Sequence, residues 1–244
     1  MADKNSTIDS LTSFVDVLSE NNIVKDPSPL YELIAGLRRS TPERGLGYRL
    51  DCLEFNNVAT NQFIRSDKWD DASFLVQLNL DIAINSHGVF KFGDVKTSVV
   101  EIVFEALSEE TTNYSRGAWH LDYHAFEEPT EFIHPSYHFH FGGKRIKESV
   151  DNYGDIIILD APRVMHPPLD LFLAVDFLVT NFLEKRAWQA LRADTRYQSM
   201  VKDSQNNWWK DYFKQIAEYW GQADSQANQL MMQSKAKLSN PHLI

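Results

Sequence analysis

The amino-acid sequence predicts an α+β protein in which a central antiparallel or mixed β-sheet is flanked by N-terminal and C-terminal helices. Three stretches of different periodicity predict this fold class. Apolar residues recur at three- and four-residue steps within residues 1–40, at two-residue steps within about residues 48–160, and again at three- and four-residue steps within residues 168–222. Helices and strands grouped in this way favour such a sheet over alternating βαβ units.

The chain is expected to form a single domain over residues 1–222, because no Gly/Ser-rich or Pro-rich linker divides it. Its 244 residues, of which 43% are hydrophobic, suffice for a sizeable core. Residues 223–244 are rich in Gln, Asn, Ser and Ala and contain no aromatic residue. They are expected to form a polar tail, either a loosely attached helix or a disordered segment.

Two helices are expected before the sheet. The first spans residues 6–20, and Ser6 and Asp9 match a capping arrangement at its start. The second ends at Arg39 and has Ser28 as its expected N-cap, because the proline that follows suits a first helical turn.

The clearest strand spans residues 74–85, where six apolar side chains alternate with polar ones. Shorter strands are expected near residues 48–52 and at residues 156–159. Residues 95–107 are rich in β-branched side chains and favour a strand, although Glu101 and Glu105 would also share one face of a helix.

Residues 169–183 are the most apolar segment and are expected to form a buried helix, since about 20 apolar residues are needed to cross a bilayer. Asp170 and Asp176 interrupt this segment, and a buried carboxylate needs a partner. We expect Arg163 or a histidine of the sheet to be that partner. Further along, aromatic residues at helical spacing are expected to be core, or else a surface for a protein partner or a second copy of the chain: Trp208, Trp209, Tyr212, Phe213, Tyr219 and Trp220.

Charge and cysteine content narrow the class of protein. The net charge of −10 works against tight, sequence-independent binding of nucleic acid, which relies on clustered Lys and Arg. Cys52 is the single cysteine and no hydrophobic leader follows Met1, so the expected compartment is the cytoplasm, with no membrane attachment. The sequence also lacks a nucleophile elbow, a P-loop and an HExxH helix, which disfavours the hydrolases that depend on them.

Residues 116–143 hold the best candidate for a functional site. They contain five of the eight histidines. At the two-residue period of a strand, His120, Asp122 and His124 point to one side, and His138 and His140 of a second segment also share a side. If the two segments pair, one sheet face is aromatic core and the other carries four imidazoles and a carboxylate.

Such a face suits a metal ion. Histidine nitrogens and a carboxylate oxygen are donors that zinc, manganese or ferrous iron accept, and a catalytic site would leave one position open for water. The candidate metal ligands, for zinc or manganese, are His120, His124, His138 and His140. Asp122 is the carboxylate that would complete the set or orient one imidazole.

A metal-free site is the alternative chemistry. Basic residues surround the histidines in sequence and would bind phosphate: Arg116, Lys144, Arg145, Lys147 and Arg163. A histidine base, a histidine acid and an arginine are sufficient for phosphodiester cleavage, including transesterification of RNA. The remaining interpretation is structural, with the histidines as ordinary hydrogen-bonded residues of a half-buried sheet.

A second candidate lies at residues 160–166. Asp160 and Arg163 follow a predicted buried strand, where catalytic groups are often displayed on a rigid base, although the two could simply pair to hold the turn. His166 comes shortly afterwards.

These patterns predict a hydrolase that acts on a phosphodiester or nucleotide, with RNA or DNA among its substrates. The predicted catalytic residues are His120, Asp122, His124, His138, His140 and Asp160, and the predicted substrate-binding residues are Arg116, Arg145, Arg163 and His166. The alternative function is a non-catalytic adaptor or a subunit of a larger cytoplasmic assembly. In that case the aromatic C-terminal helices form the interface with a protein partner or a second copy.

Overall fold

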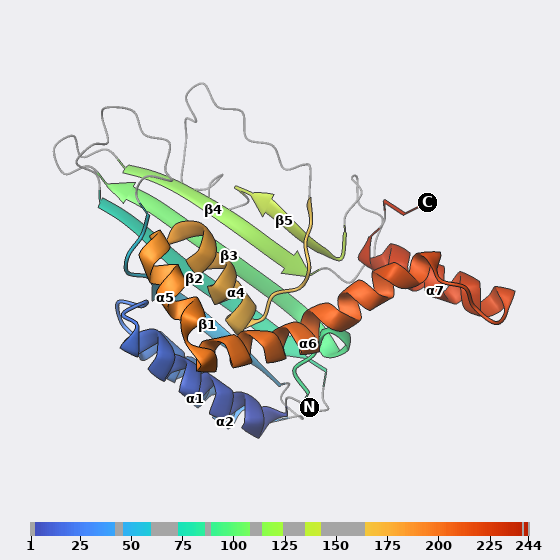
Figure 1. Ribbon diagram of the computed structural model, residues 1–244, viewed down its shortest axis with the longest axis horizontal. Coiled ribbons are helices and arrows are strands. Elements are labelled where there is room, and N and C mark those ends of the chain that lie inside the picture. Colours follow the sequence, from blue (N-terminus) through green and yellow to red (C-terminus); the bar gives the residue numbers. More distant parts are fainter. Residues whose placement is uncertain are drawn as a thin grey trace.

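A six-stranded antiparallel sheet is the centre of the computed structural model (Figure 1), which describes residues 3–41, 46–59, 73–85, 89–107, 114–123, 135–142, 164–240 and 242–243. The strands lie in chain order and each pairs with the next. They are β1 (Leu46–Glu54), β2 (Ser73–Ile84), β3 (Val95–Leu107), β4 (Tyr114–Tyr123), β5 (Tyr137–Phe141) and β6 (Val164–Met165). The strand expected at residues 156–159 lies outside the described residues.

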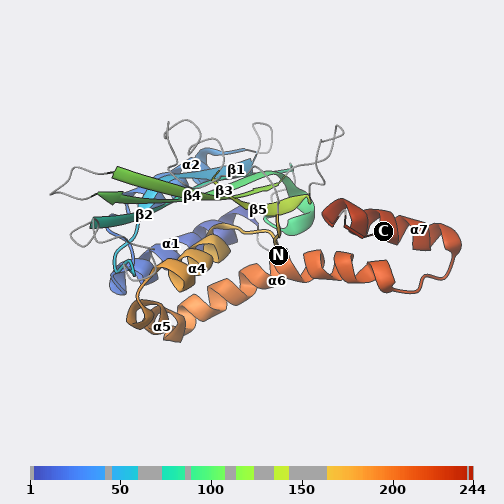
Figure 2. The ribbon, with the colours of Figure 1, turned by 90° about the horizontal axis from the view of Figure 1, so that it is seen from above.

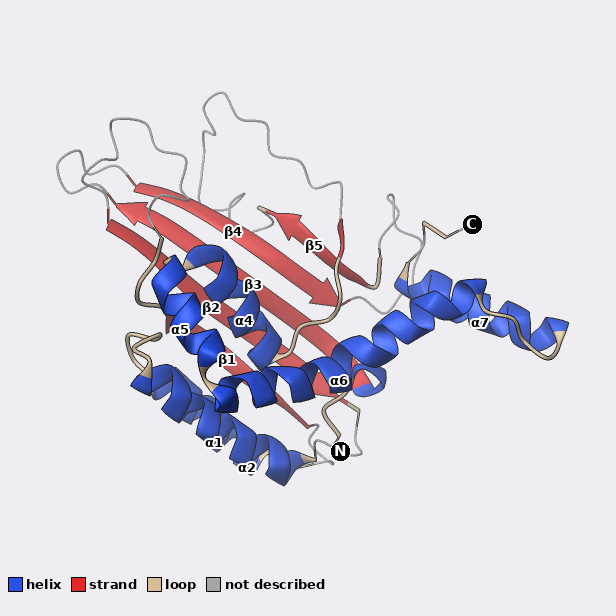
Figure 3. Ribbon diagram, in the orientation of Figure 1, coloured by secondary structure: helices blue, strands red, loops and turns tan. Residues whose placement is uncertain are grey.

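Helices precede and follow the sheet along the chain (Figure 3), which confirms the predicted α+β class. The helices are α1 (Lys4–Glu20), α2 (Ser28–Arg39), α4 (Leu171–Phe182), α5 (Lys185–Ala193), α6 (Thr195–Ala217) and α7 (Gln226–Ser239). In the described residues, two short 3-10 turns, η4 (Phe92–Asp94) and η5 (Glu218–Trp220), connect other elements. No helix in the described part of the chain is long and apolar enough to span a membrane.

The helices α1, α4 and α6 lie against one face of the sheet (Figure 2), and the core fills the space between the two layers. On β2 the predicted alternation is observed, because Val76, Leu78, Leu80, Ile82 and Ile84 are all buried. Within the helical layer, the ring of Phe14 lies 4.8 Å from that of Phe172 and 5.8 Å from that of Tyr197, measured between centroids. Phe14 therefore joins α1 to both α4 and α6.

The starts of the first two helices differ from prediction. Asp3, and not Ser6, is the N-cap of α1, and its carboxylate accepts a hydrogen bond from the Ser6 amide at 2.8 Å. In α2 the helix already includes Ser28, whose amide and hydroxyl both donate to the Asp26 carboxylate. Several acceptors close together in sequence make the first helical residue hard to predict.

The two aspartates of α4 have partners other than the expected ones. Asp170 caps the helix by accepting a hydrogen bond from the Leu173 amide at 3.0 Å. Asp176 accepts two hydrogen bonds from Arg192, at 2.9 and 2.8 Å, and one from the Tyr197 hydroxyl at 3.1 Å. Contrary to the prediction, no histidine in the described part of the sheet pairs with these carboxylates, and Arg163 lies outside the described residues.

The C-terminal helices form an arm that extends past the end of the sheet (Figure 1). Part of the predicted polar tail is the helix α7, which packs along the end of α6, and Gln215 donates hydrogen bonds to the Lys235 carbonyl at 2.9 Å and the Ser239 hydroxyl at 2.8 Å. The Ser136 hydroxyl, just before β5, donates to the Leu238 carbonyl. The arm is thus attached to the sheet close to the predicted histidine site.

Candidate functional site

The strands β4 and β5 pair in the way the predicted site requires. His120 lies opposite His140, and Asp122 lies opposite His138. Side chains of directly opposed residues share a sheet face, so these four residues form one surface, here called the imidazole face. The structure therefore brings together four of the predicted residues.

Core packing on the other side of the same strands holds the imidazole face in place. Leu121 lies between His120 and Asp122 in sequence and is fully buried. Trp119 packs its ring 5.0 Å from that of Phe139. Because side chains alternate along a strand, burial of these residues against the helices leaves the histidines on the opposite side of the sheet.

The imidazole rings are stacked in a row. The ring centroids of His120 and His140 lie 5.2 Å apart with 17° between the ring planes, and those of His138 and His140 lie 5.5 Å apart with 20° between the planes. His138 is only 1% exposed, and its Nδ1 lies 3.2 Å from the Pro135 carbonyl oxygen. A ring that is held at Nδ1 presents Nε2 to its surroundings, as in many histidines that bind a metal.

Three residues of this face form a group that could hold a metal ion. One ligand atom from each of Asp122, His138 and His140 lies within 4.8 Å of the other two. Ligand atoms around a zinc ion with bonds of about 2.0–2.2 Å are roughly 3.5 Å apart. Small side-chain rotations would therefore close the group around an ion, with two nitrogens and one oxygen as ligands.

The electrostatics of Asp122 fit this role. Burial alone raises the pKa of its carboxyl, but the hydrogen bond from His140 and the charges of His120, His140 and His138 outweigh burial, and the pKa is lowered. Oδ2 lies 3.5 Å from His140 Nε2, while Oδ1 is buried and has no hydrogen-bond partner within the described ranges. Asp122 therefore stays ionised and has an oxygen available for a ligand.

Glu101 of β3 extends the imidazole face, and the sequence had not singled it out as a site residue. It lies opposite His120, is 5% exposed, and its Oε1 is 3.2 Å from His120 Nε2. Asn79 of β2 donates a hydrogen bond to the other oxygen at 2.9 Å. The position of Glu101 opposite His120 follows from the pairing of β3 with β4, which the sequence alone does not reveal.

Three other described residues of the predicted site do not join the metal group. His120, a predicted metal ligand, lies on the imidazole face but is not one of the three residues whose ligand atoms converge. Arg116 shares the imidazole side of β4 but forms an ion pair with Glu105 at 2.8 Å. His166 lies on the core side, where its ring packs 5.3 Å from Phe139 and 5.6 Å from Phe177. Burial lowers the pKa of His166, so a neutral ring suits this apolar position.

The remaining predicted residues lie outside the described part of the chain. They are His124, Arg145, Asp160 and Arg163. Their roles as ligand, catalytic or phosphate-binding residues therefore stay predictions.

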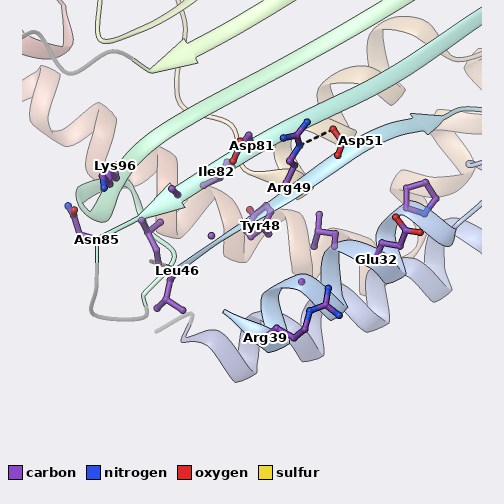
Figure 4. Close-up of a pocket in the computed structure, with 16 residues that line it drawn as sticks. Glu32, Arg39, Leu46, Tyr48, Arg49, Asp51, Asp81, Ile82, Asn85 and Lys96 are labelled. Atoms are coloured by element: carbon purple, nitrogen blue, oxygen red, sulfur yellow. Dashed lines mark hydrogen bonds and ion pairs between the residues drawn. The ribbon is translucent and has the colours of Figure 1, made fainter. Parts of the chain in front are cut away.

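A separate hollow of about 900 Å³ lies between α2 and the strands β1 and β2 (Figure 4). Among the described residues that line it, three are basic and three are acidic, namely Arg39, Arg49, Lys96, Glu32, Asp51 and Asp81. Arg49 and Asp51 form an ion pair at 3.0 Å. None of the predicted site residues that the structure describes lines this hollow, and its mixed charge favours no single ligand class.

Comparison with known proteins adds no relative. The chain matches no protein-family model, no curated protein and no solved structure. Its function has to be inferred from the imidazole face and the other surfaces alone.

Proposed function

We propose that this chain is a metal-dependent hydrolase whose divalent ion is bound by Asp122, His138 and His140. The observation that carries the proposal is the convergence of these three ligand atoms within 4.8 Å. Two histidines and one carboxylate leave coordination positions free for water and substrate, which a catalytic site requires and a closed structural site does not provide.

A phosphodiester or nucleotide is the substrate class that this arrangement suits. A bound ion stabilises charge on a phosphoryl oxygen and lowers the pKa of its water, so that hydroxide forms near neutral pH. The hydroxide oxygen would bond to phosphorus, the bond from phosphorus to the leaving oxygen would break, and that oxygen would take up a proton from solvent.

Neighbouring residues have supporting roles in the proposal. His120, beside Glu101, stacks on His140 and is placed to bind the substrate or the attacking water. Arg116 lies four residues from His120 along β4, about 13 Å at the rise of a strand. Since Arg116 also holds Glu105, it would contact an adjacent phosphate of a longer substrate and not the reacting one.

Metal binding can be tested first, without a substrate. Protein purified without a polyhistidine tag would be stripped with EDTA and titrated with zinc and manganese by calorimetry and thermal unfolding. We expect binding of one ion and a raised Tm. The double variant His138→Ala, His140→Ala should lose both effects, while His242→Ala, an exposed histidine outside the site, should keep them.

Hydrolysis is the second measurement. The stripped and metal-loaded proteins would be assayed on bis-p-nitrophenyl phosphate and on short RNA and DNA strands. The proposal requires activity that depends on the ion and is lost in the double variant. Activity that persists in EDTA would instead support the metal-free cleavage by histidines, and a folded protein that binds no ion and cleaves none of these substrates would refute both enzyme versions.

The adaptor function is a second candidate, favoured by the apolar surface of the arm. Phe213 and Trp220 are 50% and 68% exposed, and Leu230, Met231 and Leu238 are also exposed. Trp208 and Tyr212, by contrast, are buried and belong to the core. The alternative predicts that Trp220→Asp lowers the mass of an assembly of this chain in light scattering, while Tyr31→Asp, an exposed aromatic on α2, leaves it unchanged.

A further inference from the structure

A second hollow, of about 330 Å³, lies on the helical side of the molecule between α1, the start of α4 and α6. Its volume is at the lower end of the range for small-molecule sites. The described residues that line it include two carboxylates, Asp170 and Asp203, and no Lys, Arg or His. The hollow therefore differs in charge from the one beside α2.

The Asp170 carboxylate is the central feature of this hollow. It is 5% exposed, and it accepts hydrogen bonds from the Leu173 amide and from the Ser204 hydroxyl. Burial raises the pKa of Asp170 to about 6, and the groups that oppose this effect are the Ser204 hydroxyl and backbone amides, none of them a cation. A buried carboxylate with neutral donors alone is stabilised further by a positive ion.

Thr7 of α1 supplies an independent indication of a ligand. It lines the same hollow and is 6% exposed, yet its hydroxyl has no hydrogen-bond partner in the described part of the structure. Buried polar groups are normally satisfied. A hydroxyl without a protein partner at the wall of a hollow is a group to which a bound molecule can hydrogen-bond.

Aromatic rings form the apolar wall of the hollow. Phe90, Phe172 and Trp208 line it and are each less than a tenth exposed. Aromatic faces attract cations and pack against hydrocarbon. The wall thus complements a ligand that has an apolar part as well as a positive charge.

We propose that this hollow binds a small organic ammonium ion, with its N–H groups directed to Asp170 and the Thr7 hydroxyl. The hydrocarbon part of the ligand packs against Phe90, Phe172 and Trp208. This site is separate from the imidazole face, which lies on the other side of the sheet, and it does not depend on the hydrolase proposal.

The experiment compares two probes of nearly equal shape and different charge. Phenethylammonium and phenethyl alcohol would each be titrated into the full chain, with calorimetry and tryptophan fluorescence as readouts, because Trp208 lines the hollow. We expect the ammonium ion to bind at least about ten-fold more tightly than the alcohol, a difference of roughly 1.4 kcal/mol.

Three variants locate the binding. Asp170→Asn keeps a residue that caps helices well, and it should reduce ammonium affinity about ten-fold without changing the affinity for the alcohol. Asp211→Asn, an exposed carboxylate on the same helix α6 as Ser204, is the matched control and should bind as the wild type does. Thr7→Val keeps the shape of the side chain and should weaken ammonium binding more modestly.

Several outcomes would overturn the proposal. Equal affinity for the two probes would show that charge has no role. Unchanged ammonium affinity in Asp170→Asn and Thr7→Val would place the binding elsewhere, and the absence of binding at millimolar ammonium would remove the site. If Asp170→Asn does not fold, Thr7→Val and the comparison of the two probes still decide the question.

Discussion

Three carboxylates on buried positions, Glu101, Asp170 and Asp176, are stabilised by three different sets of neighbours. Asp176 has a cation, because Arg192 donates two hydrogen bonds to it. Glu101 has Asn79 and His120, and Asp170 has a hydroxyl and an amide. Because the cost of burying a charge depends on these partners, each carboxylate should respond differently to mutation and to pH.

Removal of the cation beside Asp176 should destabilise the protein. Arg192→Leu leaves a carboxylate whose side chain is 9% exposed and whose one remaining donor among the described residues is the Tyr197 hydroxyl. We expect a loss of about 2 kcal/mol in the free energy of unfolding, below the usual value for a buried pair because the Arg192 side chain is partly solvated. The control is Arg186→Leu, which removes an exposed arginine of the same helix and should change the free energy of unfolding in urea little. Equal losses of stability in the two variants would show that the pairing of Arg192 with Asp176 has no specific effect.

Asp170 should make stability fall as pH rises. Its pKa is raised from 3.8 to about 6 in the folded protein, so the folded state holds this proton more tightly than the unfolded state. The resulting stabilisation is complete below about pH 4 and is lost as pH rises through about 6. A shift of this size corresponds to roughly 3 kcal/mol.

The measurement is urea unfolding of the wild type and Asp170→Asn across this pH range. The asparagine does not titrate, so the stability of the variant relative to the wild type should increase by about 2–3 kcal/mol from pH 4 to pH 7. Both proteins share all other titrating groups, so their effects cancel in the difference. A difference that stays constant with pH would contradict the raised pKa of Asp170.

At the scale of helices and strands, the sequence predicted the strands better than the helix ends. The predicted strand at residues 74–85 differs from β2 (Ser73–Ile84) by one residue at each end, because alternation at a buried face allows only one register. The start of α1 was misplaced because Asp3, Ser6 and Asp9 all have side chains that can cap a helix. Local sequence cannot choose among neighbouring caps.

The candidate site was predicted in part for a related reason. Which side of β4 and of β5 carries histidines follows from alternation within each strand. The pairing of His120 with His140 and the contribution of Glu101 depend on strand register, which residues distant in sequence determine. The nearness of His166 to the other histidines in sequence wrongly predicts that it joins their site, because its ring packs against Phe139 on the core side.

Gly36 in α2 offers a test of helix propensity. A Cβ atom added to Gly36 would meet nothing within 4 Å, and the residue lines the hollow of Figure 4. Gly36→Ala should therefore raise the free energy of unfolding by about 0.5–1 kcal/mol. At Gly47 in β1 an added Cβ atom would clash with the Ile82 carbonyl oxygen. Gly47→Ala should therefore lower the free energy of unfolding by about 1–3 kcal/mol. Thermal unfolding of both variants checks the opposite signs.

At the scale of the whole molecule, the two faces of the strands β4 and β5 differ in their surroundings. One face of β4 and β5 packs on the helices through residues such as Leu121 and Phe139, and the other carries Asp122, His138 and His140. The helical layer is itself connected by aromatic contacts of Phe14 with α4 and α6. Stability should therefore depend mainly on one face of the sheet, and the proposed metal binding on the other.

Phe14→Ala tests this separation of stability from metal binding. Its ring is fully buried and contacts both Phe172 and Tyr197, so its removal should lower the free energy of unfolding by about 3–5 kcal/mol. Phe213→Ala, which removes a half-exposed ring, should cost far less. In both variants, studied at a temperature where they remain folded, zinc affinity should equal that of the wild type, because β4 and β5 keep their pairing.

The double variant His138→Ala, His140→Ala should show the reverse pattern, with zinc binding lost and the stability of the metal-free protein changed less than in Phe14→Ala. A parallel loss of zinc affinity in Phe14→Ala would mean that the helical layer determines the geometry of the imidazole face.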